Sequence, residues 1–288
     1  MTVAPRPPSF VRGFRHWFPR LEHRSPATVN RDNRAQLITD DQALSQGGLA
    51  AEGLSRSFGS EQAVVDVDLV VPRGEIHAVV GLNGAGKTTL MRLLLGMLRP
   101  DQGRVQVMGC DVSMADGQVW RHVGHMIEAP FGYPELTVVE NLQAAARLHG
   151  LPRAAARAAT ERQVERLQLM QWAHRRRRAL SAGNRQRIGL GCALIHDPTV
   201  LVLDEPTNSL DPFGVVLIRQ LLQQASRQGA AILVSSHHLD EMARTARHLH
   251  VMHRGRMVGS LDPHGVDLER SFFELILSVD QAQQEQSR

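Results

Sequence analysis

Lysine is almost missing from this chain of 288 residues, and cysteine is scarce. Of the 33 Lys and Arg residues, 32 are Arg and the single lysine is Lys87. Cys110 and Cys192 are too few for a disulfide framework and lack metal-ligand spacing, so we expect two reduced thiols. No run approaches the roughly 18 apolar residues of a membrane span, and residues 1–30 lack the apolar centre of a secretory signal. These absences predict a cytosolic protein that reaches a membrane only through a partner.

The net charge of +4 is concentrated in one segment. Residues 1–30 contain five Arg and one Glu, and the rest of the chain has 28 basic and 28 acidic residues. A balanced body argues against a polyanion as the partner. The run His174–Arg178 invites a nucleic-acid interpretation, but the solvated face of a helical region explains it more simply.

Residues 1–47 are rich in Pro, Arg and polar residues and show no strand pattern, which predicts a mostly disordered basic extension. Five apolar side chains fall at helical spacing between the arginines: Phe10, Phe14, Trp17, Phe18 and Leu21. Such a segment is able to lie on an anionic membrane face, although Gly13 and Pro19 weaken a helix there. A flexible tail and a start codon assigned too far upstream are the alternatives.

The stretch around the single lysine is the most informative. Residues 76–80 are an apolar run that predicts a buried strand, and residues 90–95 have helical composition. A strand, a Gly-rich loop and a helix are the context of a phosphate loop, in which glycines let backbone N–H groups surround an anion. We therefore predict an ATP site formed by Gly81, Leu82, Asn83, Gly84, Ala85, Gly86, Lys87, Thr88 and Thr89.

Two side chains of this loop have expected chemical roles. Lys87 would reach the β- and γ-phosphates and assist catalysis, and the Thr88 hydroxyl would bind Mg²⁺. A chain that otherwise uses arginine has kept a compact ammonium here, where a planar guanidinium would not fit. For the loop taken alone, a chance Gly-rich turn is the alternative.

A second apolar strand, at 200–203, ends in two carboxylates, Asp204 and Glu205. Nucleotides bind at the carboxyl edge of open α/β sheets, which is where this strand would place Asp204. Asp204 is expected to hold Mg²⁺ through water, and Glu205 to take the proton from the attacking water. An acidic pair alone is equally typical of a solvated sheet edge, and the upstream phosphate loop favours the catalytic interpretation.

Hydrophobic patterns predict the remaining architecture. The patterns at residues 54–59 and 63–71 predict antiparallel strands joined by a tight turn, and residues 104–109 alternate like a half-exposed strand. Residues about 130–190 should form a helical insertion, with helices at 138–149, 153–170 and from 182. Strands at 200–203 and 232–235 separated by a helix over 215–228 indicate a parallel sheet, and a closing helix is expected at about 268–279.

Three further segments carry a resemblance to a known family: Leu180–Arg187, Ser209–Pro212 and Ser235–His237. Together with the phosphate loop and the acidic strand end they resemble, in order, the motifs of the ATP-binding subunit of ABC transporters over residues 48–288. The resemblance implies an α/β fold, a P-loop NTPase core with an antiparallel β subdomain and an inserted α-helical subdomain. It implies ATP and Mg²⁺ as ligands and a head-to-tail pair of ATP-binding subunits, expected to be a homodimer. It also implies a separate integral membrane permease, which would hold this chain at the cytoplasmic face of the plasma membrane.

The same resemblance assigns roles to individual residues. Phe58 would stack on adenine, and His237 would be the catalytic switch histidine near the γ-phosphate, although core packing is the ordinary explanation for either residue alone. Three residues would contact the ATP of the opposite subunit: Ser181, Gly183 and Asp211. Ala182 and Asn184 depart mildly from the Gly and Gln of the family's signature.

Glu128 is the most informative departure, because most of the family has Gln at this position. A carboxylate near Asp204 and Glu205 is expected to contact the metal and to tighten Mg²⁺ binding. With the residues that follow it, Glu128 resembles the branch associated with lantibiotic and bacitracin self-protection. We therefore expect export of a peptide antibiotic or a similar amphipathic compound.

Two other functions are weaker candidates. A soluble ABC-type ATPase acting on nucleic acid or ribosomes would carry a long coiled-coil insertion or a second ATP domain, and the sequence has neither. A regulatory module that binds ATP without turnover is disfavoured by the intact Lys87, Asp204, Glu205 and His237.

Overall fold

The first part of the fold is an antiparallel sheet. The computed structural model describes residues 48–286, so the predictions for residues 1–47 lie outside the described range. Strands β1 (Leu49–Phe58) and β2 (Glu61–Val71) form the predicted hairpin, with Phe58 opposite Glu61 at its tip. β4 (Gln102–Val107) and the short β5 (Cys110–Asp111) complete the order β2-β1-β4-β5.

The second sheet is the core of the fold and has the order β10-β9-β3-β8-β7-β6. Its strands are β3 (Ile76–Val80), β6 (Val123–Met126), β7 (Val200–Asp204), β8 (Ala231–Ser236), β9 (His248–His253) and β10 (Arg256–Leu261). All neighbours are parallel except β10, which runs antiparallel to β9. The predicted parallel sheet is confirmed, and β6, β9 and β10 are additions to it.

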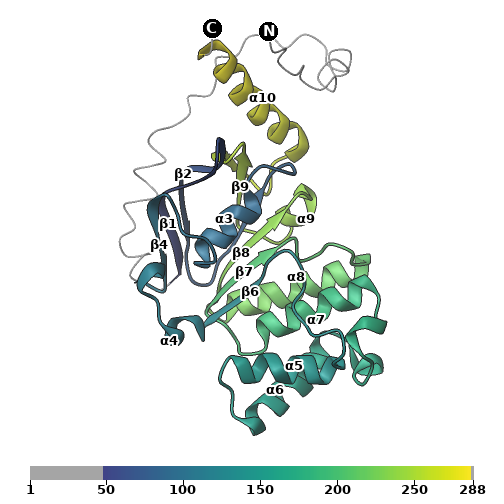
Figure 1. Cartoon of the computed structure of the whole chain (residues 1–288). Coiled ribbons are helices and arrows are strands. Elements are labelled where there is room, and N and C mark those ends of the chain that lie inside the picture. Colours follow the sequence, from purple (N-terminus) through teal and green to yellow (C-terminus); the bar gives the residue numbers. More distant parts are fainter. Residues whose placement is uncertain (1–47, 287–288) are drawn as a thin grey trace, which may run out of the picture. The chain divides into compact units, whose positions relative to one another are not determined.

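Helix α3 (Lys87–Leu94) lies between the two sheets (Figure 1). Its side chains Leu90 and Met91 belong to a buried cluster that includes Leu54 of β1 and Val79 of β3. The helix therefore has apolar partners on both sides, and its first residue, Lys87, is held at the carboxyl edge of the core sheet.

The other face of the core sheet is covered by helices, which Figure 1 shows in teal and green. The helices against the sheet are α7 (Ala182–Leu194) and α8 (Pro212–Arg227), and α5 (Val138–Leu148) and α6 (Arg153–Arg166) pack on the far side of α7. The 3₁₀ turns Met170–Trp172 and Arg177–Ala179 lie between α6 and α7. The remaining elements are the 3₁₀ turn Val112–Met114, α4 (Gly117–Trp120), α9 (Leu239–Ala243) and α10 (Leu268–Gln286). Within residues 48–286, none of the helices combines the length and apolarity that crossing a bilayer requires.

The predicted helix over 153–170 is too long, because α6 ends at Arg166. Gln168 takes a left-handed φ of 55°, and the Leu169 N–H donates to the Val164 carbonyl at 2.8 Å. This is a Schellman turn, and the residues whose backbones it joins, Val164 and Leu169, both have buried side chains. The closing helix shows the opposite error, since α10 continues to Gln286 rather than ending near 279.

Two histidines stack where α5 and α7 end. The rings of His149 and His196 are 3.6 Å apart at their centroids with 9° between their planes. Burial, followed by the charge of His149, lowers the pKa of His196 to about 3. Burial also lowers the pKa of His149, so the stack is neutral near pH 7.

This stack predicts acid sensitivity. Between pH about 6.5 and about 3 the unfolded chain binds a proton at position 196 that the folded chain does not, so the free energy of unfolding falls as the pH falls. We expect a loss of about 1.4 kcal/mol per pH unit from His196 alone. Urea unfolding midpoints across this pH range measure the slope. His196→Gln should flatten it, whereas the exposed control His264→Gln should not, and equal slopes in both variants would contradict the assignment.

Candidate functional site

The loop between β3 and α3 has a backbone that requires glycine. Gly86 has a φ of 104°, and a Cβ added there would lie 2.3 Å from the Ala63 carbonyl oxygen. A Cβ on Gly81 would likewise lie 2.3 Å from the Met252 carbonyl oxygen. Because β2 and β9 approach this closely, the loop can wrap only as a glycine-rich segment, with the N-terminus of α3 opening into it.

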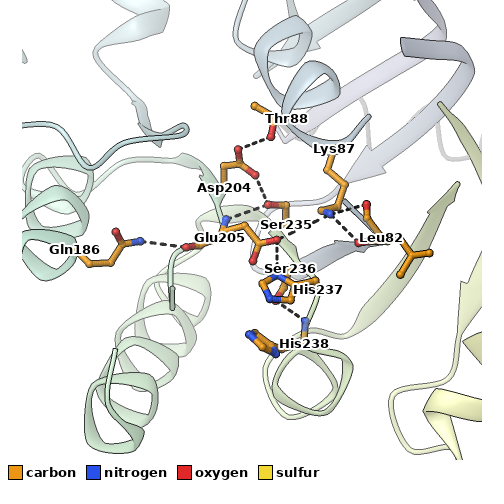
Figure 2. A network of polar contacts seen from close by, with 11 residues as sticks. Leu82, Lys87, Thr88, Gln186, Asp204, Glu205, Ser235, Ser236, His237 and His238 are labelled. Carbon is orange, nitrogen blue, oxygen red and sulfur yellow. Dashed lines mark hydrogen bonds and ion pairs between the residues drawn. The ribbon is translucent and has the colours of Figure 1, made fainter. Parts of the chain in front are cut away.

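Lys87 is folded back into this loop. Its Nζ donates to the carbonyl oxygens of Gly81 at 2.7 Å and Leu82 at 3.3 Å, and it lies 4.0 Å from a carboxylate oxygen of Glu205 (Figure 2). Only 7% of the residue is exposed. Burial lowers the pKa of Lys87, and the nearby charges of Glu205 and Asp204 oppose that shift. The ammonium is thus placed at the mouth of the loop next to the acidic pair.

Asp204 ends β7 and joins three elements of the site. The Thr88 hydroxyl donates to one carboxylate oxygen of Asp204 at 2.7 Å, and the Ser235 hydroxyl donates to the other. Asp204 is 6% exposed. A buried carboxylate beside a threonine hydroxyl is a set of hard oxygen donors at the end of the parallel sheet, as the sequence predicted for Thr88 and Asp204.

Glu205 follows in a left-handed conformation, with a φ of 48°. Its backbone N–H donates to the Ser235 hydroxyl at 3.0 Å, which holds this uncommon conformation. One carboxylate oxygen contacts His237 Nδ1 at 2.9 Å, and the other oxygen is buried with no hydrogen-bond partner among residues 48–286. Because an unpaired buried carboxylate oxygen is costly, it indicates a place for a polar ligand such as water.

The predicted opposite-subunit residues lie together around two helix starts. Ser181 caps α7 by accepting the Asn184 N–H at 3.2 Å, and Asp211 caps α8 by accepting the Gly214 N–H at 2.6 Å. A Cβ on Gly183 would lie 2.9 Å from the Ser209 carbonyl oxygen, so the two segments touch. No hydrogen bond or ion pair in the described part of the chain joins Ser181, Gly183 or Asp211 to the phosphate loop.

Two of the predicted site residues, Phe58 and Glu128, are in contact with arginines. The Arg56 guanidinium carbon lies 5.1 Å from the centroid of the Phe58 ring, which is 45% exposed at the end of β1. Glu128 forms an ion pair with Arg92 of α3, and its side chain is 57% exposed. The structure therefore pairs Glu128 with a cation and not with Thr88 or Asp204, and the metal role of Glu128 stays a prediction.

Comparison with known proteins decides the family. The sequence profile described as "ABC transporter" matches residues 64–208, which include the phosphate loop, the signature segment and the acidic strand end. The chain belongs to the ABC transporter family. A second profile, described as an AAA domain, matches residues 176–243.

Curated relatives within the ABC transporter family agree. The bacitracin transport ATP-binding protein BcrA of Enterococcus faecalis is 36% identical over 215 residues, covering 73% of this chain and 68% of the relative. The BcrA protein of Bacillus licheniformis is 33% identical, covering 78% and 73%. The daunorubicin resistance ATP-binding protein DrrA3 of Streptomyces coeruleorubidus is 35% identical, covering 75% and 68%. This chain is accordingly an ATP-binding subunit of ABC type, and an ATPase.

Solved structures confirm the predicted fold class. An ATP-binding subunit of an ABC transporter superimposes with a TM-score of 0.70 at 29% identity, covering 79% of this chain and 93% of that one. A dimeric bacterial ABC transporter cassette, MJ0796, has a TM-score of 0.69 at 20% identity, covering 75% and 99%. The latter identity is low, so that similarity shows the fold alone.

Sequence reasoning missed three residues that organise this ABC-type site. The Ser235 hydroxyl donates to Asp204 and accepts from the Glu205 N–H, whereas the sequence pattern indicates only a strand residue before His237. Gln186 donates to the Glu205 and Pro206 carbonyl oxygens, each at 3.1 Å, and so connects α7 to the acidic pair. Arg92 neutralises Glu128 from the exposed side of α3. For Ser235 a signal was present in the sequence: it is a polar residue in an otherwise apolar strand, and a buried polar side chain usually forms a hydrogen bond.

Proposed function

We propose that this chain is the ATPase motor subunit of an exporter and powers a separate membrane permease that expels a peptide antibiotic or a similar amphipathic compound. The motor role rests on one observation: Lys87 and His237 both approach the Glu205 carboxylate, next to the Thr88–Asp204 hydrogen bond. The export role rests on relatives named for bacitracin transport and daunorubicin resistance.

In this proposal the loop exchanges internal hydrogen bonds for bonds to ATP. The carbonyls of Gly81 and Leu82 are the present partners of Lys87 Nζ, and the β- and γ-phosphates would replace them. The backbone N–H groups of residues 81–89 would surround the phosphates, aided by the N-terminus of α3. Phe58 would stack on adenine once the Arg56 side chain moves aside.

The Thr88 hydroxyl and the Asp204 carboxylate fit Mg²⁺, which prefers one or two protein oxygens together with substrate phosphates. When bound, Mg²⁺ neutralises phosphate charge during phosphoryl transfer. Glu128 is a further candidate ligand and would have to leave Arg92 to serve as one.

Glu205 would act as the general base. Its unpaired buried oxygen is positioned to accept a proton from water, while the other oxygen is held by His237. Ser235 and Gln186 hold the backbone on either side of this carboxylate, so they are positioning residues. His237 would also contact the γ-phosphate, because its ring lies next to the Glu205 carboxylate.

A second copy of the chain would complete the site. Among residues 48–286, the contacts of Ser181, Gly183 and Asp211 lie in the neighbourhood of α7 and α8, which leaves the N-terminus of α7 available to an anion. We propose that in a head-to-tail homodimer these residues face the ATP held by the phosphate loop of the other copy. The pair would bind the permease at the cytoplasmic face of the plasma membrane.

The experiment for this function is a resistance assay. A sensitive host expressing the full chain with the permease encoded next to its gene should tolerate several-fold more bacitracin-type peptide than a host with the permease alone. The variant Lys87→Met should remove the protection. Protection that does not depend on Lys87, or a neighbouring gene for DNA repair or the ribosome, would contradict the proposal.

Glu128→Gln tests the family departure separately. The Arg92–Glu128 pair is solvent-exposed, so its loss should cost at most about 1 kcal/mol of stability. We expect ATP hydrolysis to be retained, with less compound exported per ATP. The matched variant Arg92→Gln removes the same pair but keeps the carboxylate. Unchanged export in Glu128→Gln would count against a coupling role for this side chain.

A further inference from the structure

A cluster of histidines lies at the end of β3 that is opposite to the phosphate loop. β3 and β9 are parallel neighbours, and their register places His77 beside His248 and Val79 beside His250. Glu75 directly precedes β3. Neither the ATP site nor any predicted motif uses these side chains. Glu75 precedes β3 and Gly81 follows it, so the length of β3 separates the two ends.

The side chains converge on one point. The His77 Nε2 atom lies 3.0 Å from the Glu75 Oε2 atom, and the His248 Nε2 atom lies 3.8 Å from the same oxygen. One ligand atom from each of the three residues lies within 4.8 Å of the other two. Tetrahedral coordination with bonds of about 2.0–2.2 Å separates ligand atoms by about 3.3 Å, so small side-chain rotations are enough to close the site.

The buried histidine is already oriented for this role. His77 is 5% exposed, and its Nδ1 atom lies 3.0 Å from His250 Nε2. The tautomer in which His77 donates its Nδ1–H to His250 Nε2 leaves the His77 Nε2 lone pair for a metal, as seen around metal-bound histidines in general. His248, with a side chain that is 48% exposed, leaves the point open to solvent.

One positive group opposes a cation here. Arg247 Nη1 lies 2.9 Å from Glu75 Oε1, the carboxylate oxygen that faces away from the histidines. The Arg247 side chain is 70% exposed, so water and salt screen its charge. It also fixes the orientation of Glu75, which leaves Oε2 for the metal.

We propose that Glu75, His77 and His248 bind a divalent ion of the zinc class, with His250 as the positioning residue for His77. Two imidazoles and one carboxylate are a ligand set that zinc uses, with water in the remaining position. The ion would clamp the start of β3 to the start of β9, and this inference does not depend on the proposed function.

Metal titration of the full chain tests the inference. Chelator-treated protein in excess Mg-ATP, which occupies the oxygen-ligand site, is titrated with Co²⁺ and then with Zn²⁺. We expect visible absorption typical of nitrogen and oxygen ligands, saturating at a single ion per chain and displaced by Zn²⁺. Zn²⁺ at a hundredfold excess over its Kd should raise the Tm by about 5–10 °C.

His248→Ala and Glu75→Gln should each weaken binding at least tenfold and remove the Tm shift, at positions partly open to solvent where folding is tolerant. His264→Ala, an exposed histidine outside the cluster, is the matched control and should bind like the wild type. Equal Co²⁺ affinity in the wild type, His248→Ala and Glu75→Gln would overturn the inference, because the network would then be only a hydrogen-bonded cluster. An intact ATPase with no metal response would overturn it as well.

Discussion

Lys87→Met is expected to abolish ATP hydrolysis, with kcat reduced by at least about 10²-fold, because loss of one preorganised charge that stabilises the transition state has effects of this size. The ammonium is the chain's single lysine and is buried against the Gly81 and Leu82 carbonyls. Methionine has a similar length and leaves an apolar side chain in a buried position, so the fold should persist. Phosphate release from ATP at saturating Mg²⁺ measures the effect.

Lys87→Arg is the informative control. It keeps the positive charge but needs room for a planar guanidinium in a loop where even a Cβ on Gly86 would lie 2.3 Å from a backbone oxygen. We expect this variant to be nearly as inactive as Lys87→Met. Unchanged urea midpoints for both variants would show that the loss is catalytic, and wild-type turnover in Lys87→Met would refute the site.

Glu205→Gln is expected to lower kcat by about 10²–10⁴-fold while leaving ATP bound, because a missing general base has effects of this size. The amide can still contact His237 Nδ1, where the carboxylate now lies at 2.9 Å, so the geometry should be retained. Binding without turnover should trap ATP between two copies of the chain. Size-exclusion chromatography with light scattering at saturating Mg-ATP should then detect a dimer.

A double variant separates nucleotide binding from pairing. Adding Ser181→Ala to Glu205→Gln removes a hydroxyl that caps α7 and that we assign to the other copy's ATP, at a cost of about 1 kcal/mol for the lost cap. The double variant should bind ATP at its own phosphate loop but dimerise less tightly. A Glu205→Gln protein that stays monomeric with ATP bound would rule out the sandwich arrangement.

Local pattern was sufficient to predict most of the fold and the centre of the site. The glycines and Lys87 could be located because their spacing is tied to a strand before and a helix after, and the structure has both. Asp204 could be located because an apolar strand ends there. In the structure it accepts a hydrogen bond from Thr88, which is 116 positions away in the sequence. Fold class follows from the alternation of strands and helices, which depends on burial and not on tertiary detail.

Tertiary contacts explain what could not be predicted. β9 reads His-Leu-His-Val-Met-His, and three histidines among six residues concealed the strand, which the structure shows paired with β3, with His77 beside His248. The end of α6 depends on a left-handed Gln168, a conformation favoured by burying Leu169 and not by the residue itself. Arg92 and Glu128 are far apart in the sequence, so no helical or strand periodicity predicts their ion pair.

The solitary lysine makes this protein a natural single-site target for amine chemistry. Apart from the amino terminus, Lys87 carries the one primary amine in the whole chain. Its burial limits the access of an acylating reagent, whereas its lowered pKa increases the reactive neutral fraction. A nucleotide seated in the loop would shield that amine. Mass spectrometry of acetylation at one peptide therefore reads out site occupancy directly, in the unmodified sequence and without a fluorescent label.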